Sequence, residues 1–228
     1  MIANVCAQVF FNAIARRYDR DYALSGSVSR ERIDMALAHI AGRHRVLVLG
    51  VGSGRELPRL LDAGHEAVGI DISAAMIALC NQRTRTIPIL ETDFWEPLPV
   101  GDRSFDAALA LHGTLAHPPS RRAFTHFTRE LGRVLRPRGV LVAEVPSSSA
   151  LERIASLPTD ASPPLPDGMR MEILSPTSYV HHDEVLGVSL DGVAYDAEGW
   201  RAIFSPTFDV VIEPLGEIEY MIVATNRL

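Results

Sequence analysis

Cysteine is scarce in this sequence: Cys6 and Cys80 are the only two among 228 residues, and no Cys-x-x-Cys pair occurs. Two thiols so far apart do not form the disulfide framework of small secreted proteins, and we expect both to serve packing rather than chemistry. This cysteine usage is typical of a reducing compartment and predicts a cytoplasmic protein.

Positive charge is also scarce, with 22 Lys and Arg against 28 Asp and Glu, a formal net charge of −6. We therefore expect no nucleic acid partner, because the chain has no general attraction to phosphate backbones. Residues 2–15 are rather apolar, but Asn4, Gln8, Asn12 and Arg16 recur at every fourth position and indicate an amphipathic helix. This stretch lacks a basic leader and is too short and polar to cross a bilayer, so we expect no membrane partner.

The sequence does contain an apolar strand that ends in glycines. Residues 46–49 are aliphatic throughout, as in a strand buried on both faces of a parallel sheet, and Gly50, Gly52 and Gly54 follow. Glycines can adopt positive φ and let a ligand approach bare backbone. A short helix predicted over residues 55–63 would then direct its free amides at that ligand.

The next segment repeats this order of strand and helix and adds an acidic residue. Residues 66–70 predict a second strand with Asp71 at its carboxyl end, and Ser73 is placed to cap the following helix. Asp71 comes 17 residues after Gly54, close to the roughly 20 that dinucleotide sites use. An acid there can bind ribose hydroxyls, so the pair predicts a nucleotide-type cofactor.

Further strands complete an α/β pattern. We predict strands over residues 88–92, 105–111 and 139–145, with a helix over residues 121–135 between the last two. Residues 208–213 and 219–224 are apolar and separated by a short segment with Pro214 and Gly216, which predicts adjacent antiparallel strands. With 47% hydrophobic residues, the chain can bury one substantial core and needs no second domain.

Five motifs in order, VLVLGVGSG, VGIDIS, ILETDFWEPLP, FDAALALHGTLAH and LGRVLRPRGVLVAEVP, resemble the series of class I S-adenosylmethionine-dependent methyltransferases over residues 45–146. The resemblance implies a Rossmann-like seven-stranded sheet, mostly parallel with a C-terminal antiparallel strand and with helices on both faces. It also implies S-adenosyl-L-methionine as cofactor and in-line methyl transfer to O, N or C of a small-molecule acceptor. Leu111-His112-Gly113-Thr114 stands where amino-methylating enzymes carry Asn-Pro-Pro-Tyr, which disfavours nucleobase and protein-glutamine amines.

Site residues are implied by the same resemblance. The glycines would line the methionine portion of the cofactor, Asp71 would bind the ribose diol, and Ile72 would pack on the adenine. Further cofactor contacts would come from Asp93 on the adenine amino group, Phe94 against the ring, Leu111 and His112 closing the pocket, and Tyr18 near the cofactor carboxylate. An acid that commonly stands two residues before the first glycine is replaced by Val48.

The catalytic candidates are His112, His182 and Glu144. His112 stands at the rim of the cleft, where it serves either as a group near the reacting centre or as a residue that orders the loop. His181 and His182 are neighbours on a predicted strand and point to opposite faces, so at most one faces the pocket, as base or substrate contact, and we expect no metal site. Glu144, inside an apolar strand, needs a partner or a place near the strand's open end.

Four segments are expected within a single domain, residues 1–228. Residues 1–44 would form N-terminal cap helices, residues 45–146 the cofactor-binding core, and residues 198–228 a terminal helix and hairpin. Residues 147–197, rich in Ser and Pro, favour an insertion or substrate lid rather than a helix, with strand-like pieces over residues 170–174 and 184–190.

Two other functions remain open from the sequence. A cofactor-binding or regulatory protein could keep the fold without transfer, and Val48 together with the lack of a clear base supports that alternative. An NAD-type oxidoreductase is disfavoured, because its fingerprint needs a glycine three positions after Gly52, where Arg55 stands.

Overall fold

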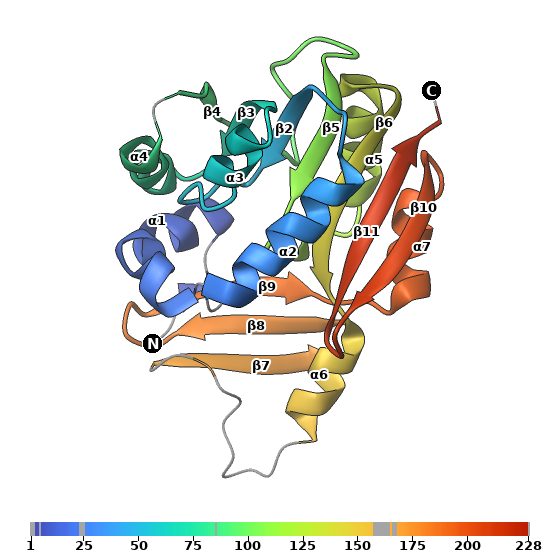
Figure 1. The fold of residues 1–228 in the computed structure, drawn as a ribbon. Coiled ribbons are helices and arrows are strands. Elements are labelled where there is room, and N and C mark those ends of the chain that lie inside the picture. Colours follow the sequence, from blue (N-terminus) through green and yellow to red (C-terminus); the bar gives the residue numbers. More distant parts are fainter. Residues whose placement is uncertain are drawn as a thin grey trace.

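A seven-stranded sheet in the order β10-β11-β6-β5-β2-β3-β4 forms the centre of the molecule (Figure 1). The computed structural model describes residues 3–4, 6–22, 26–84, 86–156, 165 and 168–227. The strands of this sheet are β2 (Arg45–Leu49), β3 (Glu66–Asp71), β4 (Ile89–Glu91), β5 (Phe105–Ala110), β6 (Leu135–Pro146), β10 (Phe208–Leu215) and β11 (Glu219–Asn226). Strands β4, β3, β2, β5 and β6 pair in parallel, whereas β11 is antiparallel to both β6 and β10. The predicted fold class is confirmed.

Helices cover both faces of this sheet because its strands are apolar on both sides. One face packs on α2 (Gly26–His39) and α3 (Leu57–Asp62), and the other on α5 (Ala123–Val134) and α7 (Ala197–Phe204). Trp200 of α7 is fully buried and donates a 2.9 Å hydrogen bond from Nε1 to the carbonyl of Pro146. The end of β6, where the chain leaves the sheet, is thereby fixed to the helical layer.

Within the seven-stranded sheet, the predicted element boundaries are close to those observed, with one informative exception. The fifth predicted strand, residues 139–145, is longer in the structure, because Leu135 already pairs with Phe105 before Pro137 and Gly139. A register shift between Phe105 and Ala107 absorbs the intervening residues. Pro137 and Gly139 predicted the end of the helix correctly. They could not show that strand pairing with β5 already begins at Leu135.

A second, four-stranded sheet lies across one end of the first (Figure 1). Its order is β1 (Ala3–Asn4), β9 (Val188–Val193), β8 (Ser178–Asp183) and β7 (Met169–Ser175). Three of these strands come from the predicted insertion, residues 147–197. The expectation of no helix there is wrong, since α6 (Ser148–Ala155) begins after Ser147, whose side chain caps it. The second predicted strand is also misplaced, because residues 184–187 form a turn between β8 and β9.

The N-terminal helix α1 (Ala7–Arg17) joins the two sheets. Two residues of its predicted polar stripe contact the β3–α4 connection: Gln8 Nε2 donates to the Ile72 carbonyl, and Asn12 Oδ1 accepts from Ser73 Oγ. Helix α4 (Ala74–Arg83) therefore starts against α1. At the other end, Arg17 Nη1 lies 3.3 Å from Asp183 Oδ1 of β8, which ties the second sheet to the same helix. Within the described ranges, no helix is long and apolar enough to cross a membrane.

Candidate functional site

A cavity of about 520 Å³ opens at the carboxyl ends of the parallel strands. The loops after β2, β3 and β5 form one side, α1 another, and the second sheet the third. Among the residues expected to bind a cofactor or act in catalysis, those lining it are Tyr18, Gly50, Gly52, Asp71, Ile72, His112 and Glu144. Leu111 lines a narrower hollow beside it, together with Tyr18 and His112. Residues far apart in the sequence are thus brought to one site.

The glycine loop is shaped by close neighbours. Gly50 and Gly54 have φ values of +58° and +74°, which side chains rarely allow. A Cβ on Gly50 would lie 2.7 Å from Thr114 Cγ2, and one on Gly54 would lie 2.6 Å from the buried Cys80 Sγ. Both glycines are therefore needed for packing, whereas Gly52 presents open backbone to the cavity.

Asp71 is held by the loop that it faces. Its Oδ2 accepts a 2.7 Å hydrogen bond from the Gly52 amide, and its Oδ1 accepts a 2.8 Å bond from the Ser73 amide. Burial raises the pKa of Asp71, while these backbone amides oppose the shift. The carboxylate reaches the cavity in a fixed orientation, as an acceptor for ligand hydroxyls.

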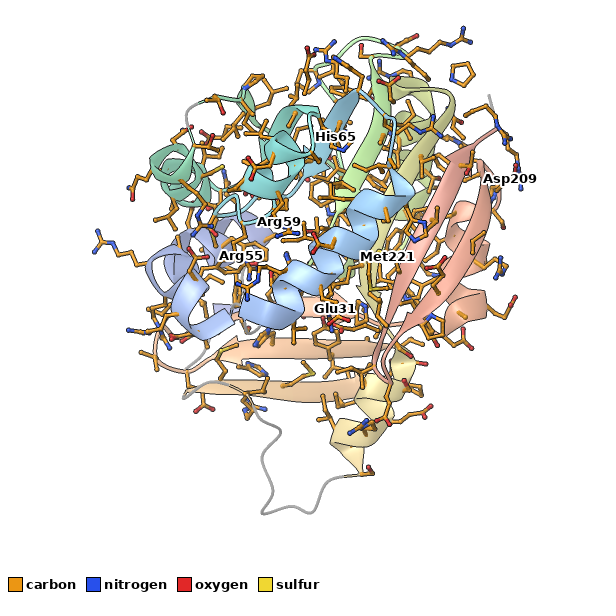
Figure 2. The ribbon with its side chains drawn as sticks, viewed as in Figure 1. Glu31, Arg55, Arg59, His65, Asp209 and Met221 are labelled. Carbon is orange, nitrogen blue, oxygen red and sulfur yellow. The ribbon has the colours of Figure 1, made fainter. Side chains whose placement is uncertain are left out.

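Arg55 is a site residue that the sequence did not single out. Its Cζ lies 5.1 Å from the centre of the Tyr18 ring, and Nη2 donates a 3.3 Å hydrogen bond to the Tyr18 hydroxyl. Figure 2 shows it beside α2, on the side where α1 approaches. Among the described residues, its buried Nη1 has no hydrogen-bond partner. A buried guanidinium donor without a partner is costly, so Nη1 indicates an anionic group on the ligand.

His112 lies between the glycine loop and the far end of the cavity. Its φ of +57° is unusual for a residue with a side chain, and its amide donates a 3.0 Å hydrogen bond to Glu144 Oε2. Burial, with added repulsion from Arg55 and Arg32, lowers the pKa of His112 to about 3. The imidazole is therefore neutral near pH 7 and is too weak a base to accept a proton there. It fits a hydrogen-bonding role better than the role of a base.

Glu144 finds the partner that its burial requires. It is 1% exposed and forms an ion pair with Arg32 of α2, which also pairs with Glu219 of β11. Both carboxylates line the cavity. Burial raises the pKa of Glu219, and Arg32 opposes the shift. Two acids thus share one guanidinium at this part of the cavity wall.

Glu56, directly after Arg55, carries a buried carboxyl below the glycine loop. Burial raises its pKa from an ordinary 4.5 to about 7, and Asp71 adds repulsion. A carboxyl with a raised native pKa stabilises the fold fully below its unfolded pKa, and that contribution is lost as pH rises through the native value. The range concerned runs from about pH 4.5 to about pH 7.

We expect the variant Glu56→Gln to remove this pH dependence. Between about pH 4.5 and about pH 8, the unfolding free energy of the parent chain should fall by about 3 kcal/mol relative to the variant, because one pKa unit corresponds to about 1.4 kcal/mol. Urea unfolding of both proteins across this range measures the difference. A gap that stays constant with pH would contradict the raised pKa, whatever the absolute stability of the variant.

Four of the expected site residues line neither the cavity nor the hollow beside it. Gly54 packs on Cys80, and His182 points its Nε2 at Glu172 Oε2, 3.1 Å away. Asp93 Oδ1 accepts from the Trp95 amide, and the Phe94 ring packs on Trp95 and Phe127. The roles expected for Asp93, Phe94 and His182 remain predictions, and on β8 it is His181 that lines the cavity.

Two other lining residues, Glu219 and His117, had no site role expected from the sequence. Glu219 lies in a predicted hairpin strand, and His117 is the last residue of the motif FDAALALHGTLAH. No local sequence pattern indicates a site role for either residue. Glu219 reaches the cavity because its strand pairs with β6, and His117 reaches it through the course of the loop after β5. Within the part of the chain that the structure describes, no three His, Cys, Asp or Glu side chains are grouped to hold a metal ion.

Comparison with known proteins agrees with this geometry. A family model described as a methyltransferase domain matches residues 46–139. The CcbJ methyltransferase from Streptomyces caelestis superposes with a TM-score of 0.74 at 17% identity, covering 95% of this chain and 98% of that one. The chain thus has the fold of class I S-adenosylmethionine-dependent methyltransferases.

Two further methyltransferases are similar to this chain. The 1,6-didemethyltoxoflavin-N1-methyltransferase of Burkholderia thailandensis has a TM-score of 0.63 at 17% identity, over 99% of this chain and 93% of that one. A demethylmenaquinone methyltransferase of Lactiplantibacillus plantarum is 31% identical over 146 residues, covering 59% of this chain and 60% of that protein. The chain spans about half the length of the curated relatives it matches.

The described residues fit the cofactor of this family. Asp71 offers a fixed carboxylate for the two ribose hydroxyls, and Gly52 offers backbone without a side chain in the way. The partnerless Nη1 of Arg55 is a suitable donor for the carboxylate of the methionine portion. These three groups open into one cavity, so the donor and acceptor set matches a nucleoside joined to an amino acid.

Proposed function

We propose that this chain transfers a methyl group from S-adenosylmethionine to a small-molecule acceptor. The observation that carries the proposal is the single cavity of about 520 Å³, into which Asp71, Gly52 and Arg55 open and which continues past His112 to an aromatic wall. A volume of this order suits small ligands, which typically occupy roughly 300–1,000 Å³. Strands β7 and β8 of the second sheet line one side of the cavity, through Met171, Tyr179 and His181.

The chemistry supplied by the bound cofactor is an electrophilic methyl group on a positively charged sulfur. The chain's own task is then mainly alignment, because in-line displacement requires the acceptor atom opposite the bond that breaks. Asp71 and Arg55 would fix the two ends of the cofactor. His112 would orient groups between them as a neutral hydrogen-bonding partner, and the second sheet would exclude water.

A small acceptor is supported by three observations. Phe10, Phe11 and Tyr179 line the end of the cavity opposite the glycine loop, which suits a compact apolar body. The toxoflavin enzyme, which is similar in fold, is named for N-methylation of a small heterocyclic molecule that is bound in its structure. The formal net charge of −6 also gives no general attraction to nucleic acid.

Calorimetry followed by a labelling assay tests the proposal. We expect S-adenosylmethionine and S-adenosylhomocysteine to bind, and NAD⁺ not to bind. With methyl-tritiated cofactor, label should pass to a panel of small amines and alcohols and not to total tRNA. Binding of NAD⁺ alone would contradict the cofactor, and label in tRNA would contradict the small acceptor. Cofactor binding without any transfer would support the inactive regulatory alternative.

A further inference from the structure

One part of the cavity has flat walls, and we call it the acceptor end. Its lining residues are Phe10, Phe11, His117, Met171, Tyr179 and Glu219. The His117 ring lies between two aromatic rings, 6.1 Å from the centre of Phe11 and 6.3 Å from that of Tyr179, with interplanar angles of 73° and 75°. Aromatic faces and a thioether favour a flat or compact apolar body between them.

The charge at this end is negative. Glu144 and Glu219 line the cavity and share the single guanidinium of Arg32. Among the described residues that line the cavity, Arg55 is the only arginine or lysine, and it stacks on Tyr18 beside the glycine loop. A carboxylate or phosphate at the acceptor end would face uncompensated negative charge in a poorly hydrated space, whereas an ammonium would be attracted.

His117 presents one nitrogen to the acceptor end. Its Nδ1 lies 2.8 Å from the main-chain carbonyl oxygen of Asp191. A carbonyl can only accept, so Nδ1 carries the hydrogen and Nε2 of the neutral ring keeps its lone pair. Burial lowers the pKa of His117, which favours this neutral form, but the hydrogen bond to Asp191 opposes the shift, whereas no such partner among the described residues raises the pKa of His112. The ring position is fixed by the Asp191 carbonyl and the two aromatic neighbours.

We propose that the acceptor is an amine on a flat apolar body, with its nitrogen attracted by Glu219 and one proton taken by Nε2 of His117. This rests on the proposed methyl transfer and narrows the acceptor atom to nitrogen. The amine enters as an ammonium and gives one proton to Nε2. The freed lone pair forms the new N–C bond while the methyl–sulfur bond breaks, and that bonding pair stays on sulfur. The product leaves as a methylammonium, and the proton on His117 passes to solvent.

A matched set of fragments tests the acceptor class without knowledge of the natural acceptor. With S-adenosylhomocysteine bound, 2-phenylethylamine should bind about 10-fold more tightly than 3-phenylpropionate, as measured by chemical-shift titration. In Glu219→Gln this preference should fall at least about 3-fold. Glu213→Gln, on the neighbouring strand β10 where Glu213 pairs with His39, is the control and should keep the preference.

The outcomes separate the two proposals. If the parent chain does not bind S-adenosylhomocysteine, the proposed function fails. If it does bind, but the carboxylate fragment binds as well as the amine, the amine acceptor is wrong. Unchanged affinity for S-adenosylhomocysteine in Glu219→Gln shows that the variant is folded; a preference that then persists would exclude Glu219 as its source.

The role of His117 has its own readout. Nitrogen-15 spectra of the imidazoles, assigned with His117→Gln, should show Nδ1 protonated and Nε2 bare near neutral pH; the opposite tautomer would overturn the role of base. With any amine that accepts methyl, His117→Gln should lower kcat by about 100-fold with little change in KM. His126→Gln, exposed on α5, is the control. Unchanged kcat in His117→Gln would also contradict the proposal.

Discussion

Replacing Asp71 by alanine is expected to weaken S-adenosylhomocysteine binding by about 100-fold or more, corresponding to about 3 kcal/mol. Two effects combine in this loss. The carboxylate would no longer accept the ribose hydroxyls, and the amides of Gly52 and Ser73 would lose the oxygen atoms that hold them at 2.7 Å and 2.8 Å. Calorimetric titration of the parent chain and the variant gives the change directly.

Asp106→Ala is a matched control for this experiment. Asp106 also accepts hydrogen bonds from two consecutive backbone amides, those of His44 and Arg45, and pairs with Arg136. It lies at the start of β5, whereas the cavity lies at the strands' carboxyl ends. We expect lower stability but unchanged affinity for S-adenosylhomocysteine. An equal loss of affinity in both variants would mean that Asp71 acts through the fold alone.

Replacing Arg55 by methionine is expected to weaken S-adenosylhomocysteine binding by about 30-fold while leaving 5′-methylthioadenosine unaffected. The second ligand has the same nucleoside but lacks the amino-acid portion, so the ratio of the two affinities isolates the carboxylate. A charge-assisted hydrogen bond to a buried guanidinium is worth about 2 kcal/mol, which gives the expected size. Methionine retains much of the apolar stem that packs on Tyr18.

Arg59→Met, one turn along α3, is the control for Arg55. Arg59 is partly exposed and pairs with Asp34 of α2. We expect this variant to bind both ligands as the parent chain does. Loss of both ligands in Arg55→Met would show that the residue supports the pocket's shape instead of binding the carboxylate. Equal affinity for both ligands in the parent chain would contradict the role of Nη1 outright.

Local sequence patterns predicted the cofactor half of the site because the physics there is local. Gly50 and Gly52 follow directly from a buried strand, and Asp71 stands at the end of the next one. Parallel strands bring their carboxyl ends to the same edge, so spacing along the chain translates directly into proximity. The fold class could be predicted for the same reason, since it rests on a regular alternation of strands and helices.

Val48, which stands where the family commonly has an acid, shows the limit of predictions from local sequence patterns. Val48 is buried in an apolar cluster with Leu57 and Leu60, so no carboxylate reaches the loop from β2. The buried acid that binds the loop after β5 is Glu144, which accepts from the His112 amide. Its charge is tolerated because Arg32 arrives from α2, more than 100 residues earlier in the chain. Only the packing of the helix on the sheet could show that pairing.

The acceptor end likewise depends on tertiary structure. His112 and His182 looked like comparable candidates in the sequence, but burial makes His112 a very weak base and strand orientation points His182 at Glu172. His117 and Glu219 reach the cavity through a loop bonded to Asp191 and a strand paired with β6.

The sequence by itself determined the sheet, the glycine loop and the place of Asp71 at the end of its strand, because these follow from the periodicity of strands and helices and the special backbone of glycine. Which other side chains line the cavity, and which of them are charged there, was decided only by the tertiary structure. The orientation and the charge of these side chains depend on burial and on long-range ion pairs, and no local sequence pattern reveals either of these.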